Sequence, residues 1–376
     1  MKIGGISSSL AGWLYYLKQD TDFEVDLVVF NDEFDSKYES IKHDFNVIYL
    51  KQFRSLRLSR YELKNYPTSW VFQFFGLLLL RKLHLQKFYL RRKFKKFHFD
   101  KTYDLAISFA NDIVKRQDFV LSNDFVEFSV HATKKASWIH STIDNIGMTR
   151  KYALSRYKNI DFIVNVSEAG KESLLELVPE YAKKTVVVSN PINVKLLQEK
   201  AEMEISVEKN KGEFTFVTVS RISPEKRLDR IPEIAQKLKL KGFNFHWLVI
   251  GGGKDLSHFQ ALCKQMNVEN EVQFLGASSN PFPYVKNADY FVLTSDVEAQ
   301  PLVVLEALLL GIPVIATDIP AVKDIVIEGE NGYIVPKDSI KIAEKIEEII
   351  VQKRCLKGFS FHYDRFKTEF QQLLKN

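Results

Sequence analysis

The second half of the chain alternates short, almost unbroken apolar runs with longer segments of helical pattern. The apolar runs are Phe214–Ser220, Phe245–Ile250, Val272–Phe274, Tyr290–Ser295 and Pro313–Thr317. Strands without a polar face must be buried on both sides, which is typical of a parallel sheet with helices on both faces. The pattern therefore predicts an α/β fold built on a doubly wound, Rossmann-like parallel sheet.

The first half carries a weaker version of the same pattern. Its expected strands are Glu24–Phe30, Phe45–Leu50, Tyr103–Phe109, Lys135–His140, Asp161–Ser167 and Lys184–Asn190. We therefore expect two Rossmann-like domains, residues 1–195 and 196–357, joined between Pro191 and Lys211. The amphipathic segment 358–376 is expected to form a helix that packs back on the N-terminal domain.

The beginning of the chain departs from this pattern. Gly4 and Gly5 suit the turn of a glycine-bearing loop that leads into a helix, but only Met1–Ile3 precede them. A doubly wound domain normally places a strand before that loop. The sequence thus predicts that the first strand of the N-terminal domain is missing, because the start codon lies further upstream or because the sheet has lost an edge.

Composition excludes several classes of protein. With 376 residues, 45% of them hydrophobic and 27% charged, the chain is expected to be globular with two cores. Two cysteines, Cys263 and Cys355, suit neither a disulfide framework nor a metal cluster and fit a reducing cytosol. The N-terminus does not read as a signal peptide, and the longest apolar run, Trp70–Leu80, is shorter than the about 20 residues that span a bilayer.

Positive charge is concentrated in residues 51–100. This segment has 13 Lys and Arg against two acids, Glu62 and Asp100, and it is also rich in aromatic residues. Cations are drawn to anionic lipid and aromatic side chains settle at the headgroup level, so the combination favours an interfacial membrane-binding surface. A solvated helix with a basic outer face and a nucleic-acid patch are the alternatives, and no nucleic-acid motif accompanies the charge.

The loops that follow the strands are where an open α/β sheet binds its ligands. Arg221 and Lys226 follow the first strand of the second half, in a loop that leads to a helix N-terminus, which already favours anions. A phosphate or diphosphate between the two cations would balance them, although the pair alone is equally typical of surface cations. Gly251 fits a tight turn after the next strand; because Leu256 takes the third glycine position of the dinucleotide motif, we do not expect nicotinamide binding.

Two glutamates, Glu298 and Glu306, stand eight residues apart around the expected start of a helix. Pro301 suits the first turn of that helix, which puts Glu298 in the preceding loop and Glu306 in the second turn. The rise between them is about 12 Å, which suits two parts of one extended ligand rather than joint action on one atom. The alternative is one surface glutamate and one glutamate that stabilises the helix.

Backbone groups at the same helix start are further candidates. The amides of Ala299, Gln300 and Leu302 lie where unpaired N–H groups can meet a phosphate. The leucines at helical spacing, Leu302, Leu305 and Leu309, are expected to form the buried stripe that fixes the helix in place.

Taken together, these features resemble the retaining family 4 glycosyltransferases of the GT-B fold, most closely over residues 214–336. The segments that carry the resemblance are VSRISPEKRLDR, VIGGGKD, VQFLG, NADYFVLTSDVEAQPLVVLEALLLGIPVIATDIPAVKDIV and ENGYIVP. The first half matches more weakly through GGISSSL, WIHSTID, VSEAGKESL and SNPIN. Many members have glycine where this chain has Ala299.

The resemblance implies a sugar-nucleotide site. It implies that Glu298 contacts sugar hydroxyls, that Glu306 contacts the ribose, that Arg221 and Lys226 hold the diphosphate, and that His140 is the active-site histidine. It also implies substrate contacts at Ala299, Gln300, Pro301, Leu302, Gly4, Gly5, Gly251, Gly276, Asn280 and Pro281. No metal or other cofactor is expected, and the only Asp-x-Asp, residues 20–22, reads as a turn.

The implied function is the retaining transfer of a hexosyl group from a nucleoside diphosphate sugar, with UDP favoured, to a saccharide acceptor. The nearest subgroups in appearance build capsular or other surface polysaccharide. We expect a cytoplasmic protein at the inner face of the cell membrane, an acceptor linked to polyprenyl diphosphate, an anionic membrane surface as partner, and no nucleic acid. The alternatives are another GT-B enzyme such as a nucleotide-sugar epimerase, a non-catalytic partner subunit, or a membrane-binding module without chemistry.

Overall fold

The computed structural model describes residues 5–19, 23–30, 41–56, 67–83, 85–97, 99–116, 121–204, 214–354, 356 and 358–375. The chain divides into two compact units, one of Met1–Pro191 with Asp364–Asn376 and one of Ile192–Tyr363. The sequence placed the boundary at residues 195 and 196 and the start of the final segment at residue 358, so both differ from the observed limits by a few residues.

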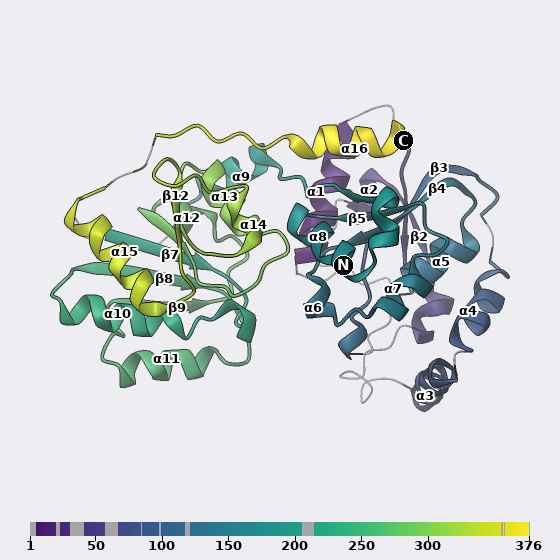
Figure 1. Ribbon diagram of the computed structural model, residues 1–376, viewed down its shortest axis with the longest axis horizontal. Coiled ribbons are helices and arrows are strands. Elements are labelled where there is room, and N and C mark those ends of the chain that lie inside the picture. Colours follow the sequence, from purple (N-terminus) through teal and green to yellow (C-terminus); the bar gives the residue numbers. More distant parts are fainter. Residues whose placement is uncertain are drawn as a thin grey trace. The chain divides into compact units, whose positions relative to one another are not determined.

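The described residues of the second unit form one sheet of six parallel strands (Figure 1). In sheet order they are β12 (Gly332–Val335), β11 (Val314–Thr317), β10 (Tyr290–Leu293), β7 (Phe214–Val219), β8 (Phe245–Ile250) and β9 (Val272–Gly276). The chain moves outward from β7 to β9 on one side and from β10 to β12 on the other, so the strand order reverses between β7 and β10. The doubly wound parallel sheet predicted from the sequence is confirmed.

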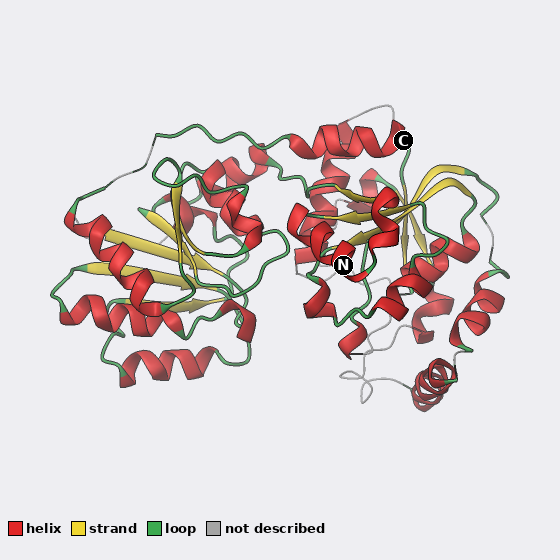
Figure 2. Cartoon of the chain, viewed as in Figure 1, coloured by secondary structure: helices red, strands yellow, loops and turns green. Residues whose placement is uncertain are grey.

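Helices flank this sheet (Figure 2), and its strands β10 and β11 are buried on both faces. The helices are α9 (Val194–Ala201), α10 (Arg230–Leu240), α11 (Leu256–Gln265), α12 (Phe282–Lys286), α13 (Leu302–Leu309), α14 (Pro320–Lys323) and α15 (Ser339–Val351), with the short 3-10 helix η6 (Pro224–Lys226). All four residues of β10 and all four of β11 are buried. Such strands have no polar face to offer to water, which is why their sequences read as unbroken apolar runs.

In the described part of the first unit there are six strands, arranged in two parallel groups. The strands β3 (Tyr103–Ser108), β4 (Ala132–Ile139), β5 (Phe162–Asn165) and β6 (Thr185–Val187) form one sheet in that order, and β1 (Asp26–Val29) pairs with β2 (Asn46–Tyr49). The first element that the structure describes is α1 (Gly5–Gln19), so Gly5 begins a helix rather than lying in a loop. Gly4 lies outside the described residues.

The two groups of strands meet at the beginnings of β1 and β3. The Tyr103 hydroxyl donates a hydrogen bond to Asp26 Oδ2 at 2.7 Å, and Lys101 Nζ lies 2.7 Å from Glu24 Oε1. In a doubly wound sheet the first strand in sequence lies between the second and the fourth, which here correspond to β1 and β3. The sequence offered two explanations for the missing strand, a start codon further upstream or a lost sheet edge. Among the described residues the break lies between β1 and β3 rather than at an edge, and residues 1–4 lie outside this range.

The remaining helices of the first unit surround these strands. They are α2 (Ile41–Asp44), α3 (Thr68–Lys82), α4 (Gln86–Phe94), α5 (Ser122–Ser129), α6 (Ile143–Ile146), α7 (Arg150–Arg156), α8 (Glu168–Leu177) and α16 (Arg365–Lys375), with the 3-10 helices η2 (Lys51–Leu56), η4 (Val114–Arg116) and η5 (Pro179–Lys184). The final helix, α16, packs on α1, where the rings of Phe370 and Trp13 lie 4.8 Å apart. Within the described ranges, no helix has both the length and the apolar character needed to cross a membrane.

A buried ionic network joins three segments of the first unit. Arg156, on α7, contacts Asp112, in the loop after β3, at 2.6 Å and Asp124, on α5, at 2.5 Å. No more than 12% of any of these three side chains is exposed. The Tyr152 hydroxyl adds a hydrogen bond to Asp112 Oδ2 at 2.5 Å. Burial raises the pKa of Asp124, and the charge of Arg156 opposes that rise.

Candidate active site

Two loops meet where the strand order of the second unit reverses. The loop after β7 carries Lys226, and the loop after β10 carries Glu298. The Thr294 hydroxyl donates to the backbone carbonyl of Lys226 at 2.9 Å, and the amide of Asp296 donates to the carbonyl of Glu225 at 2.9 Å. These bonds join the loops directly, so the fold brings together side chains that are 72 residues apart in sequence.

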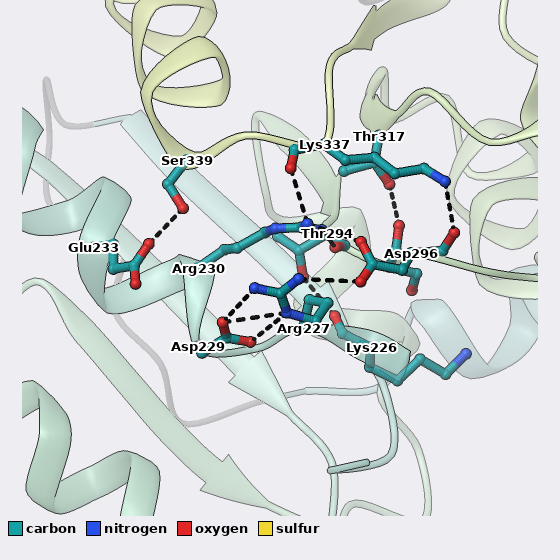
Figure 3. A network of polar contacts seen from close by, with 11 residues as sticks. Lys226, Arg227, Asp229, Arg230, Glu233, Thr294, Asp296, Thr317, Lys337 and Ser339 are labelled. Atoms are coloured by element: carbon teal, nitrogen blue, oxygen red, sulfur yellow. Dashed lines mark hydrogen bonds and ion pairs between the residues drawn. The ribbon is translucent and has the colours of Figure 1, made fainter. Parts of the chain in front are cut away.

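Two arginines fasten the same loops through one carboxylate (Figure 3). Arg230 Nη2 lies 2.7 Å from Asp296 Oδ1, and Arg227 Nη1 lies 3.1 Å from Asp296 Oδ2. Arg230 also donates to the carbonyls of Thr294 at 2.7 Å and Lys337 at 2.9 Å, and only 6% of its side chain is exposed. Although burial acts to raise it, the two guanidinium groups hold the pKa of Asp296 below its usual value.

The central contact of the site is an ion pair between Lys226 and Glu298. Lys226 Nζ lies 2.5 Å from Glu298 Oε1, and the Ser295 hydroxyl donates to the same oxygen at 2.8 Å. The two charged side chains are 15% and 11% exposed. A lysine ammonium has three N–H donors, so Lys226 can hold this carboxylate and an oxyanion at the same time.

The other expected cation of this loop, Arg221, has a different environment. Its side chain is 73% exposed, and its Nη2 lies 3.7 Å from Glu225 Oε1, beyond hydrogen-bond distance. The exposed guanidinium is therefore able to move toward an anion bound next to Lys226. The structure thus places Arg221 and Lys226 in one loop, where the side chain of Lys226 is held by Glu298 and that of Arg221 is largely exposed.

Two glycines allow the loops after β7 and β8 to lie against each other. A Cβ on Gly251 would lie 1.6 Å from the carbonyl oxygen of Ser220, and one on Gly253 would lie 2.5 Å from Ile222 Cβ. The backbone continues the strand pairing there, because the amide of Ile222 donates to the carbonyl of Gly252 at 2.9 Å. Close packing accounts for Gly251, for which the sequence predicted a substrate contact.

The candidates after β9 have structural partners. Gly276 ends the strand with a φ of +79°, and its carbonyl accepts from the amide of Gly251 at 2.8 Å. The Asn280 side-chain amide donates to the carbonyl of Lys200, on α9, at 2.8 Å, and Pro281 directly precedes α12. The side chain of Asn280 therefore ties α9 to the start of α12 in this structure.

The helix that carries Glu306 begins as the sequence predicted. Pro301 is buried and directly precedes α13, Glu306 lies inside the helix with intermediate exposure, and Ala299 lies in the preceding loop. The amide of Leu302, however, donates to the Gln300 carbonyl at 2.9 Å. This amide therefore has an intramolecular acceptor here, and its contact with a phosphate stays a prediction. The side chain of Gln300 donates to the Tyr363 hydroxyl at 2.6 Å.

His140 belongs to the first unit, where it follows β4. Its amide donates to Asn111 Oδ1 at 3.0 Å, and its ring centroid lies 4.5 Å from that of Phe109. The residue has intermediate exposure, but both ring nitrogens are buried and lack hydrogen-bond partners within the described part of the chain. Burial lowers the pKa of His140 to about 4, against a smaller opposing effect of the Phe109 backbone. The imidazole is therefore neutral at pH 7 and can offer one donor and one acceptor.

Several residues with structural roles in these sites were not predicted from the sequence. Asp296 and Arg230 fasten the two loops of the second unit, and Asn111 holds the backbone of His140. The only local signal was that Asp296 stands two residues before Glu298, in a loop already of interest. Among the described residues no group of His, Cys, Asp and Glu is arranged to hold a metal ion, and residues 20–22 lie outside that range.

A family model matches most of the second unit. Residues 199–357 match the family model Glycosyl transferases group 1. The capsular polysaccharide biosynthesis glycosyltransferase CapM of Staphylococcus aureus is 33% identical over 143 residues, which cover 36% of this chain and 37% of CapM. The chain spans between 23% and 60% of the length of the first curated relatives that it matches.

Two solved structures share the fold over nearly the whole chain. The lipopolysaccharide outer core galactosyltransferase WaaB, in its apo form, has a TM-score of 0.67 and 18% identity, with 99% of this chain and 96% of WaaB covered. HepE of Anabaena in complex with UDP-glucose has a TM-score of 0.65 and 16% identity, with 100% and 92% covered. At such identities the likeness concerns the fold alone, and it confirms the GT-B fold expected from the sequence.

Proposed function

Because residues 199–357 form a Glycosyl transferases group 1 domain, we propose that this protein transfers a sugar from a nucleoside diphosphate sugar to a hydroxyl of a saccharide acceptor. The observation that carries the proposal is the contact of Lys226 with Glu298, at 2.5 Å, where the strand order reverses. That position is where open α/β sheets bind nucleotides, and the pair offers one group for an oxyanion and one for sugar hydroxyls. UDP is the favoured nucleotide because HepE, which shares the fold, is in complex with UDP-glucose.

The proposed chemistry is mainly electrostatic. The bond between the sugar C1 and the diphosphate oxygen breaks, and negative charge gathers on the leaving diphosphate. Lys226 and the exposed Arg221 stabilise that charge from one side of the loop, so no metal ion is expected. The acceptor oxygen forms its bond to C1 on the same face, with retention of configuration, and its proton passes to the leaving diphosphate.

The remaining groups position the donor. Glu298, fixed by Ser295 and Lys226, accepts hydrogen bonds from sugar hydroxyls, and Glu306 accepts them from the ribose. His140, neutral because its ring nitrogens are buried, is expected to donate to the donor sugar.

The proposal extends to the pathway and the place of action. Because CapM is named for capsular polysaccharide biosynthesis, we place this protein in the synthesis of a surface polysaccharide, of which capsule is one kind. Its acceptor is then a saccharide carried on polyprenyl diphosphate at the cytoplasmic face of the cell membrane. The basic, aromatic composition of residues 51–100 supports such a position.

Nucleotide binding tests the first part of this proposal. We expect UDP, in a panel with GDP, ADP and dTDP, to raise the melting temperature of the full chain. Lys226→Ala should remove that stabilisation and lower the kcat/KM of transfer by about 10²–10³, because it removes a cation from the developing charge. The control is Lys237→Ala, which changes an exposed lysine on α10 of the same unit.

Three outcomes would contradict the proposal. The first is that none of the four nucleotides stabilises the protein. The second is that Lys226→Ala keeps transfer within about threefold of the wild type. The third is that UDP and a free, isomerised nucleotide sugar form from the donor but no glycoside does, which is the result expected of an epimerase.

A further inference from the structure

The outer side of α3 is apolar and exposed. Phe72, Phe75 and Leu79 are 74%, 54% and 58% exposed and recur at the spacing of one helix face. On the opposite side Phe74 and Leu77 are only 2% exposed and anchor the helix to the first unit. A surface helix normally keeps its solvent-facing side polar, so an exposed apolar side indicates a second partner.

The same surface continues onto α4, where it becomes basic. Leu83, Leu85 and Phe88 are 56%, 50% and 67% exposed. Phe88 shares its helix face with Arg91, Arg92 and Lys95, because these residues follow it at positions i+3, i+4 and i+7. Figure 1 shows α3 and α4 at the margin of the first unit. We define the α3–α4 face as the exposed side chains Phe72, Phe75, Leu79, Lys82, Leu83, Leu85, Phe88, Arg91, Arg92, Lys93 and Lys95.

The charge of this segment has one sign. Residues 67–97 contain eight Lys and Arg and no Asp or Glu. Lys87 is paired with Glu127 at 3.0 Å, but the cations of the α3–α4 face lie exposed beside the apolar residues. Two copies of this face would repel each other. An acidic protein partner would complement the positive charge but would not bury the row of large apolar side chains on α3. An anionic lipid surface answers both, since acyl chains take up the apolar residues and phosphates meet the cations.

We propose that the α3–α4 face docks the protein on an anionic membrane, with α3 lying in the interface and the basic side of α4 on the headgroups. The choice of the inner leaflet rests on the proposed function, whereas the binding itself requires neither donor nor acceptor. Docking through the first unit brings the unit that carries His140 to the surface at which a lipid-linked acceptor is found.

Flotation of the full chain with liposomes tests this inference. Phosphatidylcholine vesicles with about one third phosphatidylglycerol should carry the protein upward, vesicles of phosphatidylcholine alone should carry much less, and added salt should weaken the binding. The double variant Phe72→Ser, Phe75→Ser should partition about tenfold or more weakly, because two large apolar groups no longer enter the interface. The control is Leu240→Ser, which changes a leucine that is 81% exposed in the second unit.

A second pair of variants tests the electrostatic part. Arg91→Gln with Arg92→Gln should lose the preference for anionic vesicles, while Lys195→Gln with Lys323→Gln, at side chains that are 80% and 57% exposed, should keep it. Thermal stabilisation by UDP should be unchanged in all of these variants. If the wild type floats with anionic vesicles but UDP does not raise its melting temperature, the proposed function is refuted and this inference stands.

The inference is overturned by any of three results. One is equal flotation with neutral and anionic vesicles. Another is wild-type flotation by the Phe72→Ser, Phe75→Ser variant. The third is a wild-type dimer in sedimentation equilibrium that this variant converts to monomer without any change in vesicle binding, which would make the face an interface between copies of the chain.

Discussion

Replacement of Arg156 tests whether the buried ionic network stabilises the first unit. It contacts two carboxylates, on Asp112 and Asp124, that are 5% and 3% exposed. Arg156→Met keeps most of the apolar stem but leaves both carboxylates without their cation. Asp112 retains the hydrogen bond from Tyr152, so Asp124 bears most of the cost.

The size of that cost can be bounded from protonation. A buried carboxylate without a partner becomes neutral by binding a proton. For a group with an ordinary pKa of 3.8, the free energy of this protonation at pH 7 is about 4 kcal/mol. Breaking a buried pair typically costs about 3–5 kcal/mol, which agrees with this bound. We therefore expect Arg156→Met to lower the free energy of unfolding of the first unit by about 3–4 kcal/mol at pH 7.

The pH dependence has a definite sign. In the variant the pKa of Asp124 in the folded protein rises further above its unfolded value, so the penalty is largest at high pH and shrinks as the pH falls. At pH 5 the same protonation costs about 1.6 kcal/mol, so the difference between variant and wild type should fall below about 2 kcal/mol. Urea denaturation at both pH values, followed by circular dichroism, measures it.

The matched control lies on the same helix. Arg150, at the other end of α7, pairs with Glu180 at 2.6 Å, but these side chains are 50% and 40% exposed. Arg150→Met should therefore cost no more than about 1 kcal/mol and show little dependence on pH over this range. Equal costs for the two substitutions, or a penalty for Arg156→Met that grows toward pH 5, would refute the argument from burial.

Two further predictions concern the loops around the site. Burial lowers the pKa of His140 from 6.5 to about 4, so its contribution to stability is complete above pH 6.5 and is lost as the pH falls toward 4. His140→Asn should remove that part of the acid sensitivity, which is up to about 3 kcal/mol in the free energy of unfolding measured by urea titration at several pH values. Parallel pH profiles for the variant and the wild type would contradict this prediction. Gly251→Ala should destabilise the second unit by more than about 3 kcal/mol and weaken UDP binding measured by calorimetry, because the new Cβ would lie 1.6 Å from the Ser220 carbonyl oxygen. The milder control is Gly252→Ala, whose new Cβ would have its nearest neighbour at 3.0 Å. Equal melting temperatures for the two variants would contradict this prediction.

The strands were predictable because burial on both faces leaves a direct mark on the sequence. Each expected strand of the second half coincides with an observed one, from Phe214–Val219 to Val314–Thr317. The candidate loops followed from the same pattern, because the carboxyl ends of parallel strands lie at one edge. The contact between Lys226 and Glu298 was beyond this reasoning, since it depends on which two strands are neighbours at the reversal of order.

Partners that come from tertiary structure were not predictable. Nothing in the local sequence shows that Asp296 holds two arginines or that the amide of Leu302 is taken by Gln300. Asn280 resembles a substrate contact by position, yet its amide is used by α9. A lost edge was one of the two explanations offered for the missing strand, because chain order alone does not show that the first strand lies at the centre of a doubly wound sheet.

The charges of the two loops lead to a prediction about Glu298 that separates binding from catalysis. The four cations of these loops, Arg221, Lys226, Arg227 and Arg230, stand against the four carboxylates Glu225, Asp229, Asp296 and Glu298. The loops are thus neutral as a set. Although the Lys226 ammonium can hold both groups, the negative charge of Glu298 opposes the binding of a diphosphate beside it. Glu298→Gln keeps the shape and the hydrogen bond from Ser295 but frees the ammonium of its ion pair.

UDP has a diphosphate but no sugar, so it should bind the Glu298→Gln variant about three to ten times more tightly than the wild type, as one favourable charge interaction of about 1 kcal/mol implies. Transfer from the whole donor should fall instead, because the amide is a weaker acceptor for sugar hydroxyls than the carboxylate. Calorimetry with UDP and a transfer assay measure the two effects on one variant. Weaker UDP binding by Glu298→Gln would mean that Glu298 positions Lys226 for the diphosphate rather than opposing its binding.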